Sequence, residues 1–349
     1  MIEIAAVTDL EREVFGPVLH LLRYARERLP DVLQDINATG FRLTLGVHTR
    51  IDETVAQVVN GARAGNIYVN RNIVGAVVGV QPFGGEGLSG TGPKAGGPLY
   101  LMRLLAERPV QAARLAVVNS QGVNSEHLNS QGLNSQGVIR QFAIKQSATS
   151  VPIRGLADSE ENGSSGATLS TLRDWALQQR MGLLVAHCDQ AAAESPVCPW
   201  VDLAGPTGEA NLYGVRPRDA ILCLTQYQAH EPDLLLQLTA VLAVGSQAVW
   251  PAQARALRDR LPDAVRARIT LTQDWTGSSV HFDAVICHGE VASLLSVAKT
   301  LADRAGPIVS LIGLQPGDTR IPLERLVIER SLSINTAAAG GNASLMTIG

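Results

Sequence analysis

Short apolar runs alternate with helical patterns through the second half of the chain, and this alternation limits the folds open to it. The runs are "AILCL", "QAVW", "RITLT", "FDAVICHG" and "PIVSLIGL" (220–224, 247–250, 268–272, 282–289 and 307–314). Runs of this length are typical of strands buried on both faces of a parallel sheet. The segments between them have helical patterns; one of these, 231–245, has Pro232 in its first turn and Gly245 as its stop. The pattern predicts a doubly wound α/β sheet. We also expect a helix at 171–180 and a strand at 181–187, "MGLLVAH".

The rest of the chain divides into two parts. Residues 1–116 mix predicted helices (32–36 and 51–65, the second ended by Gly65) with predicted strands (41–49 and 66–70), which favours an α/β layer architecture. Residues 117–168 contain a five-residue repeat that begins at Asn119, "NSQGV", and recurs from Asn124, Asn129 and Asn134. Four short polar units cannot build a continuous core, so we expect a flexible linker here. A second α/β unit is expected over 169–349.

Charge and cysteine usage exclude several functions. The net charge is -3, which leaves no basic field for nucleic acid. The N-terminus lacks the cationic and apolar pattern of a signal peptide, and no apolar run has membrane-spanning length. Four cysteines without paired spacing favour a reducing cytoplasm. The pairs His187–Cys188 and Cys287–His288 lie in predicted strands, where neighbours face opposite sides, so no metal site is expected.

The stretch "FGGEGLSGTGPKAGGP", residues 83–98, matches G-x-G-x-x-G between Gly85 and Gly90. A dinucleotide loop needs a strand before it and a helix that opens inside it. Here prolines and further glycines follow Gly90, so no helix is expected to begin there. Glycine density also lets backbone N–H groups approach a small anion, with a hydroxyl from Ser89 or Thr91. The residues alone leave two alternatives, a substrate-carboxylate site or a surface turn without a ligand.

Residues 1–108 resemble the C-terminal end of the aldehyde dehydrogenase superfamily. "EVFGPVL", 13–19, is similar to its E-x-F-G-P segment, and residues 62–98 look like its glutamate-semialdehyde (pyrroline-5-carboxylate) dehydrogenase branch, as found in the bacterial bifunctional proline utilisation A family. The resemblance implies a substrate-binding site at Ser89, Gly90, Gly87 and Thr91. Ser89 and Gly90 would hold the α-carboxylate of L-glutamate γ-semialdehyde, and Gly87 and Thr91 would shape the loop. It implies NAD-binding roles for Glu13 and Phe15.

Residues 169–349 resemble the additional, dehydrogenase-related C-terminal domain of longer proline utilisation A proteins. Trp250 stands before Pro251 where a Lys contacts the cofactor in the superfamily, and Glu290 lies where a helix start faces the pyrophosphate. We therefore expect a degenerate Rossmann-like domain that does not bind NAD. The closing segment, 329–349, is similar to a flap that covers a tunnel between the two active sites. An apolar, uncharged tail of this kind is expected to dock on another surface.

The resemblance places the nucleophilic Cys, the general base and the NAD domain outside this chain, and FAD in an absent proline dehydrogenase part. We therefore expect no catalytic residue here, and a cytoplasmic fragment of a proline-catabolic enzyme that is inactive alone. Its partner would be the missing N-terminal portion, or another copy, bound through 329–349. The alternative is a non-catalytic assembly module that forms a lid on a separately encoded partner. No chemistry is assigned to 205–213 or to the repeat.

Overall fold

The computed structural model describes residues 1–90, 92–105, 161–203, 205–226, 230–277 and 279–337. Helices and strands are mixed throughout these residues, and the strands form two five-stranded sheets and two small two-stranded ones. The coarse prediction of an α/β protein is therefore confirmed. Of the expected linker, 117–160 lies outside the described residues, as do the last twelve residues of the chain.

The predicted doubly wound sheet is present. Its strand order is β11-β10-β9-β12-β13, and every neighbouring pair is parallel. The strands are β9 (Ala220–Thr225), β10 (Gln247–Pro251), β11 (Ile269–Thr272), β12 (Ala284–His288) and β13 (Ser310–Leu314). Alternate residues of β9 enter different cores: Ile221 and Cys223 pack with α7 (Glu231–Val244), whereas Leu222 packs on the side of α10 (Val291–Ala302). Helices on both faces explain why these strands are apolar without alternation.

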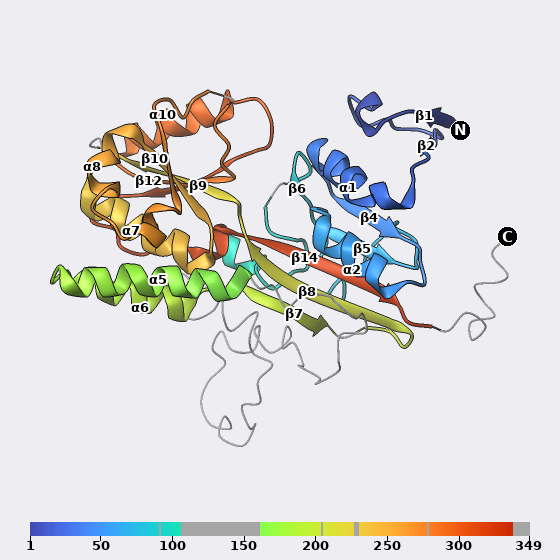
Figure 1. Cartoon of the computed structure of the whole chain (residues 1–349), viewed down its shortest axis with the longest axis horizontal. Coiled ribbons are helices and arrows are strands. Elements are labelled where there is room, and N and C mark those ends of the chain that lie inside the picture. The colour runs from blue at the N-terminus through green and yellow to red at the C-terminus, as the bar shows by residue number, and fades with distance from the viewer. Residues whose placement is uncertain (91, 106–160, 204, 227–229, 278, 338–349) are drawn as a thin grey trace, which may run out of the picture.

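Two long helices, α5 (Glu161–Gln178) and α6 (Gly182–Glu194), pack against α7 (Figure 1). The strand predicted at 181–187 is wrong, because this segment begins α6. Leu184, Cys188 and Ala191 are buried, while Leu183 is 81% exposed. That spacing is the period of a helix, and the alanine-rich continuation supports it. Because α5 starts at Glu161, the end of the expected linker is helical. The remaining short helices are α8 (Arg255–Arg258) and α9 (Asp263–Arg266).

The second large sheet joins the two ends of the chain. Its order is β4-β5-β14-β8-β7, from strands β4 (Thr44–Val47), β5 (Asn66–Val69), β7 (Cys198–Leu203), β8 (Glu209–Pro217) and β14 (Val327–Asn335). Strand β14 is parallel to β5 and antiparallel to β8, and Figure 1 shows it running through the middle of the molecule. The sheet therefore crosses the division expected between 1–116 and 169–349.

The N-terminal part packs on one face of this second sheet. Helices α1 (Leu29–Ala38) and α2 (Asp52–Gly61) share a core with β5 and β14. Helix α2 ends at Gly61, four residues before the predicted stop at Gly65. The other elements are β1 (Ile2–Ile4) paired with β2 (His20–Leu22), and β3 (Phe41–Arg42) paired with β6 (Glu86–Gly87). Five 3-10 turns lie at Val7–Asp9, Arg26–Arg28, Leu101–Arg103, Ala252–Ala254 and Leu323–Arg325 among the described residues. Within the described part of the chain, no helix combines the length and the apolar character needed to span a bilayer.

Candidate functional site

The glycine stretch folds back on the N-terminal part of the chain. The Leu88 N–H donates to the carbonyl of Gly40 (2.9 Å), which extends the β3–β6 pairing. A turn follows, in which the N–H groups of Ser89 and Gly90 donate to the carbonyls of Glu86 and Gly87, each at 3.1 Å. No helix begins at Gly90; the next regular element is the 3-10 turn at Leu101–Arg103. This confirms that the loop lacks the helix start that a pyrophosphate needs.

The loop places the predicted carboxylate donors in internal contacts. The Ser89 Oγ accepts the backbone N–H of Arg42 (3.1 Å), so its hydroxyl proton is left to donate elsewhere. The Gly90 N–H is engaged by the turn. Gly87 has a φ of 62°, which explains the glycine at this position. Thr91 lies outside the described residues. The substrate-binding role of these four residues stays a prediction.

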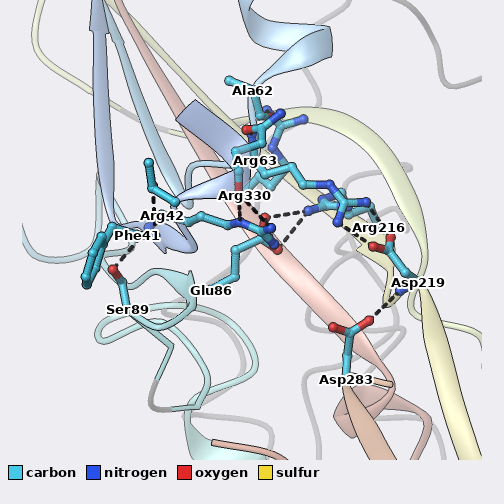
Figure 2. A network of polar contacts seen from close by, with 12 residues as sticks. Phe41, Arg42, Ala62, Arg63, Glu86, Ser89, Arg216, Asp219, Asp283 and Arg330 are labelled. Carbon is cyan, nitrogen blue, oxygen red and sulfur yellow. Dashed lines mark hydrogen bonds and ion pairs between the residues drawn. The ribbon is translucent and has the colours of Figure 1, made fainter. Parts of the chain in front are cut away.

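Glu86 lies at the centre of an arginine network (Figure 2). Its side chain is 6% exposed, and both carboxylate oxygens lie 2.7 Å from Nη2 of Arg216 in β8. Arg42 lies 4.0 Å from the same carboxylate. Arg330 of β14 donates to the carbonyls of Val59 and Ala62 at the end of α2 (2.7 and 3.1 Å). Burial lowers the pKa of Arg330 to about 9. These contacts bind the glycine loop to β8 and to Arg42 of the N-terminal part, and they bind β14 to the end of α2.

A second ion pair links the two parts of the chain beside this network. Arg63 forms a bidentate pair with Asp219, and its Nη2 lies 2.6 Å from Oδ1. Asp283 accepts the backbone N–H groups of Asp219 and Ala220. The ligand atoms of Asp219, His281 and Asp283 lie within 4.8 Å of one another, a grouping that sequence analysis missed. Because Arg63 already neutralises Asp219, this cluster is explained as part of the contact between the two parts of the chain.

Lys94 and Glu329 form the buried centre of the glycine stretch. Lys94 is 2% exposed, and its Nζ donates to Asn66 Oδ1 (2.8 Å) and to the Gly84 carbonyl (2.5 Å). Its backbone N–H donates to Oε2 of Glu329 (2.8 Å), whose Oε1 accepts the hydroxyl of Tyr213 (2.6 Å). Burial lowers the pKa of Lys94 to about 7 and raises the pKa of Glu329. The sequence signal was present but unused: a charged pair, Glu329–Arg330, interrupts an otherwise apolar strand.

A cavity of about 450 Å³ lies between the glycine loop and the edge of the doubly wound sheet. The loop contributes Gly87 and Gly90, and the sheet side contributes Phe282 and Asp283. Ser89 is not among the described residues that line this cavity.

The four cysteines are unsuited to nucleophilic chemistry. All four are buried and free; Cys223 and Cys287 lie in strands predicted for them, whereas Cys188 belongs to α6. Burial raises the pKa of Cys188, Cys198 and Cys223 to about 12 and that of Cys287 to about 11. A thiol must ionise to attack an aldehyde, so these environments disfavour it.

The position where a doubly wound sheet usually binds a nucleotide is filled by polar side chains. The strand order reverses between β9 and β12, and ligands bind at the carboxyl ends of such strands. Here His288, 1% exposed, contacts Gln237 (Nδ1, 2.8 Å) and the Asp318 carbonyl (Nε2, 2.9 Å). Gln226 accepts the backbone N–H of Glu290, the residue that precedes α10, at 2.7 Å. A pyrophosphate would have to displace these contacts, so the residues present do not fit NAD.

The two predicted cofactor contacts of the N-terminal part lie at the surface. Phe15 is 87% exposed and Glu13 is also exposed. They lie between β1 and β2, which Figure 1 places at the far end from the doubly wound sheet. Their side chains are therefore available to a ligand or to another polypeptide. Their role with NAD stays a prediction.

Comparison with known proteins identifies the protein family to which the N-terminal part of the chain is similar. Residues 7–109 match the aldehyde dehydrogenase family, and this part of the chain is of that family. Over its whole length the chain is similar to the C-terminal part of bacterial PutA: it is 49% identical over 351 aligned positions to the bifunctional protein PutA of Escherichia coli, covering 100% of this chain and 24% of the relative. The chain thus spans about a quarter of the length of the curated relatives that it matches across its whole length.

The N-terminal part is also similar to a dehydrogenase of a single activity. Over 97 residues, 27% of the chain, it is 38% identical to the human mitochondrial delta-1-pyrroline-5-carboxylate dehydrogenase, of which it covers 17%. A solved structure of proline utilization A from Corynebacterium freiburgense gives a TM-score of 0.48 at 22% identity and covers 94% of this chain and 26% of that one. The family match over residues 7–109 and the similarity to PutA confirm the family predicted from the N-terminal part of the sequence.

Proposed function

We propose that this chain is the C-terminal portion of an NAD-dependent L-glutamate γ-semialdehyde dehydrogenase that acts in the catabolism of proline to glutamate. The observation that carries the proposal is the 49% identity, over the entire chain, to a bifunctional PutA protein. The similarity of the glycine region to pyrroline-5-carboxylate dehydrogenases supports the substrate, because this aldehyde is the open form of pyrroline-5-carboxylate.

In this proposal the chain orients the substrate and leaves the bond-making step to other parts of the protein. Ser89 and Gly90 hold the α-carboxylate of the substrate, and Gly87 and Thr91 shape the loop. The Ser89 hydroxyl has a proton left to donate, which supports this role. Glu13 and Phe15, both exposed, contact NAD, which takes up the hydride when bound.

The chain alone is proposed to be inactive, because each of its thiols is buried with a raised pKa. The test is an NADH-formation assay on the purified chain, with glutamate semialdehyde as substrate, before and after co-expression with the N-terminal three-quarters of a close relative. Activity only in the co-expressed sample supports the proposal. Turnover by the chain alone refutes it.

A second candidate function is a non-catalytic assembly module that covers the tunnel of a catalytic partner. The segment expected to dock on the partner, 329–349, begins within β14, which pairs with β5 and β8 of this chain, so this candidate rests on the resemblance of that segment to a tunnel flap. The same co-expression separates the candidates. A stable complex without restored activity supports the assembly module, whereas restored activity supports a contribution to the active site.

A further inference from the structure

The second half of the glycine stretch already encloses a carboxylate, that of Glu329. The backbone N–H of Lys94 donates to its Oε2, and a side chain added at Gly97 would lie 2.8 Å from its Oε1. That separation is shorter than real Cβ contacts, so only glycine lets the backbone close around the acid. The hydroxyl of Tyr213 completes the enclosure at 2.6 Å. The glycines at this end of the loop therefore have an internal partner.

The first half of the stretch is held by separate contacts from the same strand pair. Glu86 is paired with Arg216 of β8, and Ser331 of β14 donates to the Pro82 carbonyl at 2.7 Å. Asn66 of β5 donates to the same carbonyl and accepts the N–H of Gly84. Both ends of the loop are thus held by β8 and β14, from the C-terminal part of the chain, together with β5, from the N-terminal part.

A loop so rich in glycine has a large conformational entropy to lose, and few side chains of its own to bury. The strong contacts available to such a loop are hydrogen bonds from its backbone N–H groups to a buried charged side chain. Ser89 lies between the two held points, Glu86 and Lys94. Beside its own contact with the Arg42 N–H, its position depends on how firmly those points are fixed.

We propose that Glu329 is a positioning residue for the glycine loop, with Arg216 in the same role at the other end. Strand β14 brings Glu329 into the loop, so the loop takes the conformation that presents Ser89 only when β14 is docked. The consequence for substrate rests on the proposed function: the α-carboxylate site is completed by a residue about 240 positions later in the sequence, which touches no substrate.

Hydrogen exchange of the full 349-residue chain tests this directly. In Glu329→Ala, the amides of 83–90 and 92–97 should exchange about tenfold faster or more, as expected for the loss of hydrogen bonds to a charged group. Glu329→Gln keeps an acceptor and should restore part of the protection. The control is Ser333→Ala, a buried β14 serine that donates to Asn211 (2.8 Å) and not to the loop. If the loop exchanges no faster in Glu329→Ala than in Ser333→Ala, the inference is wrong.

Two further measurements keep the test decisive. If Glu329→Ala does not fold, Tyr213→Phe removes one hydrogen bond at constant shape and should still accelerate exchange in the loop relative to Ser333→Ala. A loop that exchanges at an unchanged rate overturns the inference.

Repeating the wild-type measurement with L-glutamate examines the substrate site separately. Protection of Ser89 and Gly90 by L-glutamate, lost in Glu329→Ala, supports both proposals. Faster exchange in the variants with no effect of L-glutamate supports positioning and contradicts the carboxylate site.

Discussion

Nη2 of Arg216 lies 2.7 Å from both carboxylate oxygens of Glu86, a residue 130 positions earlier in the chain. Glu86 belongs to the G-x-G-x-x-G match, in which it is a freely variable position. In the structure it is the member of that match that fixes the loop to β8. The pair is largely shielded from water, with exposed side-chain fractions of 24% for Arg216 and 6% for Glu86.

Breaking this pair should destabilise the chain strongly. Arg216→Met leaves a buried carboxylate without its partner, which costs about 3 kcal/mol in the free energy of unfolding. The double variant Arg216→Met with Glu86→Gln should recover more than half of the loss, because no isolated charge remains. Urea unfolding measures both. The matched control is Arg173→Met, which removes an exposed pair with Asp189 and should leave stability nearly unchanged. Equal losses in the two arginine variants would contradict the prediction.

Lys94 should make the stability of the chain depend on pH above neutrality. Its pKa is lowered from 10.5 to about 7 by burial, so between these values the unfolded chain keeps a proton that the folded chain has released. Raising the pH across this window therefore favours the folded state. Compared with Lys94→Met, the wild type should gain stability from pH 7 to pH 10. Lys299→Met, at an exposed position of α10, is the control and should show no such trend relative to wild type. If the difference in stability between the wild type and Lys94→Met stays constant from pH 7 to pH 10, the lowered pKa of Lys94 is refuted.

Gly65 should tolerate no side chain, although it does not end a helix. A Cβ at this position would lie 2.1 Å from the backbone oxygen of Gly84, and backbone on both sides cannot move apart easily. Gly65→Ala should lower the free energy of unfolding by about 2 kcal/mol or more. Gly166→Ala, in α5 with open space around it, should leave stability unchanged or raise it by up to about 1 kcal/mol. Similar thermal midpoints for the two variants would show that the approach of Gly65 to Gly84 is not tight.

The four thiols should resist modification in the folded chain. Their burial and raised pKa leave little thiolate at pH 8, so a disulfide reagent such as 5,5′-dithiobis(2-nitrobenzoate) should react far more slowly than with free cysteine. All four should react promptly in denaturant, which is the control. A single cysteine that reacts at the free rate under native conditions would contradict the structure and would reopen the question of a nucleophile.

The doubly wound sheet should not bind NAD. His288 and Gln237 are buried in contact with each other at the point where the strand order reverses. Titration of the chain with NAD, followed by amide exchange of 284–290, should show no protection there at millimolar cofactor. Protection in that segment would refute this prediction. Protection confined to 13–15 would instead support the cofactor contact proposed for Glu13 and Phe15.

Local sequence patterns predicted most of the parallel sheet correctly because its strands are buried on both faces. Every residue of β12, within "FDAVICHG", is buried, and its uninterrupted apolar run indicated this. The same rule failed at "MGLLVAH", where an apolar run of similar length begins α6. The helical spacing of Leu184, Cys188 and Ala191 extends beyond that run, so a longer window would have found it. The prolines after Gly90 also sufficed to exclude a helix start.

By itself, the sequence determined the family, the class of fold and the absence of dinucleotide geometry at the glycine stretch, because these depend on residues close together in the chain. The tertiary structure alone decided what holds that stretch in place. Lys94 and Glu329 are 235 positions apart, and only the insertion of β14 between β5 and β8 brings them into contact. Strand pairing of this range depends on which edges and buried charges meet in three dimensions, and no local propensity encodes it.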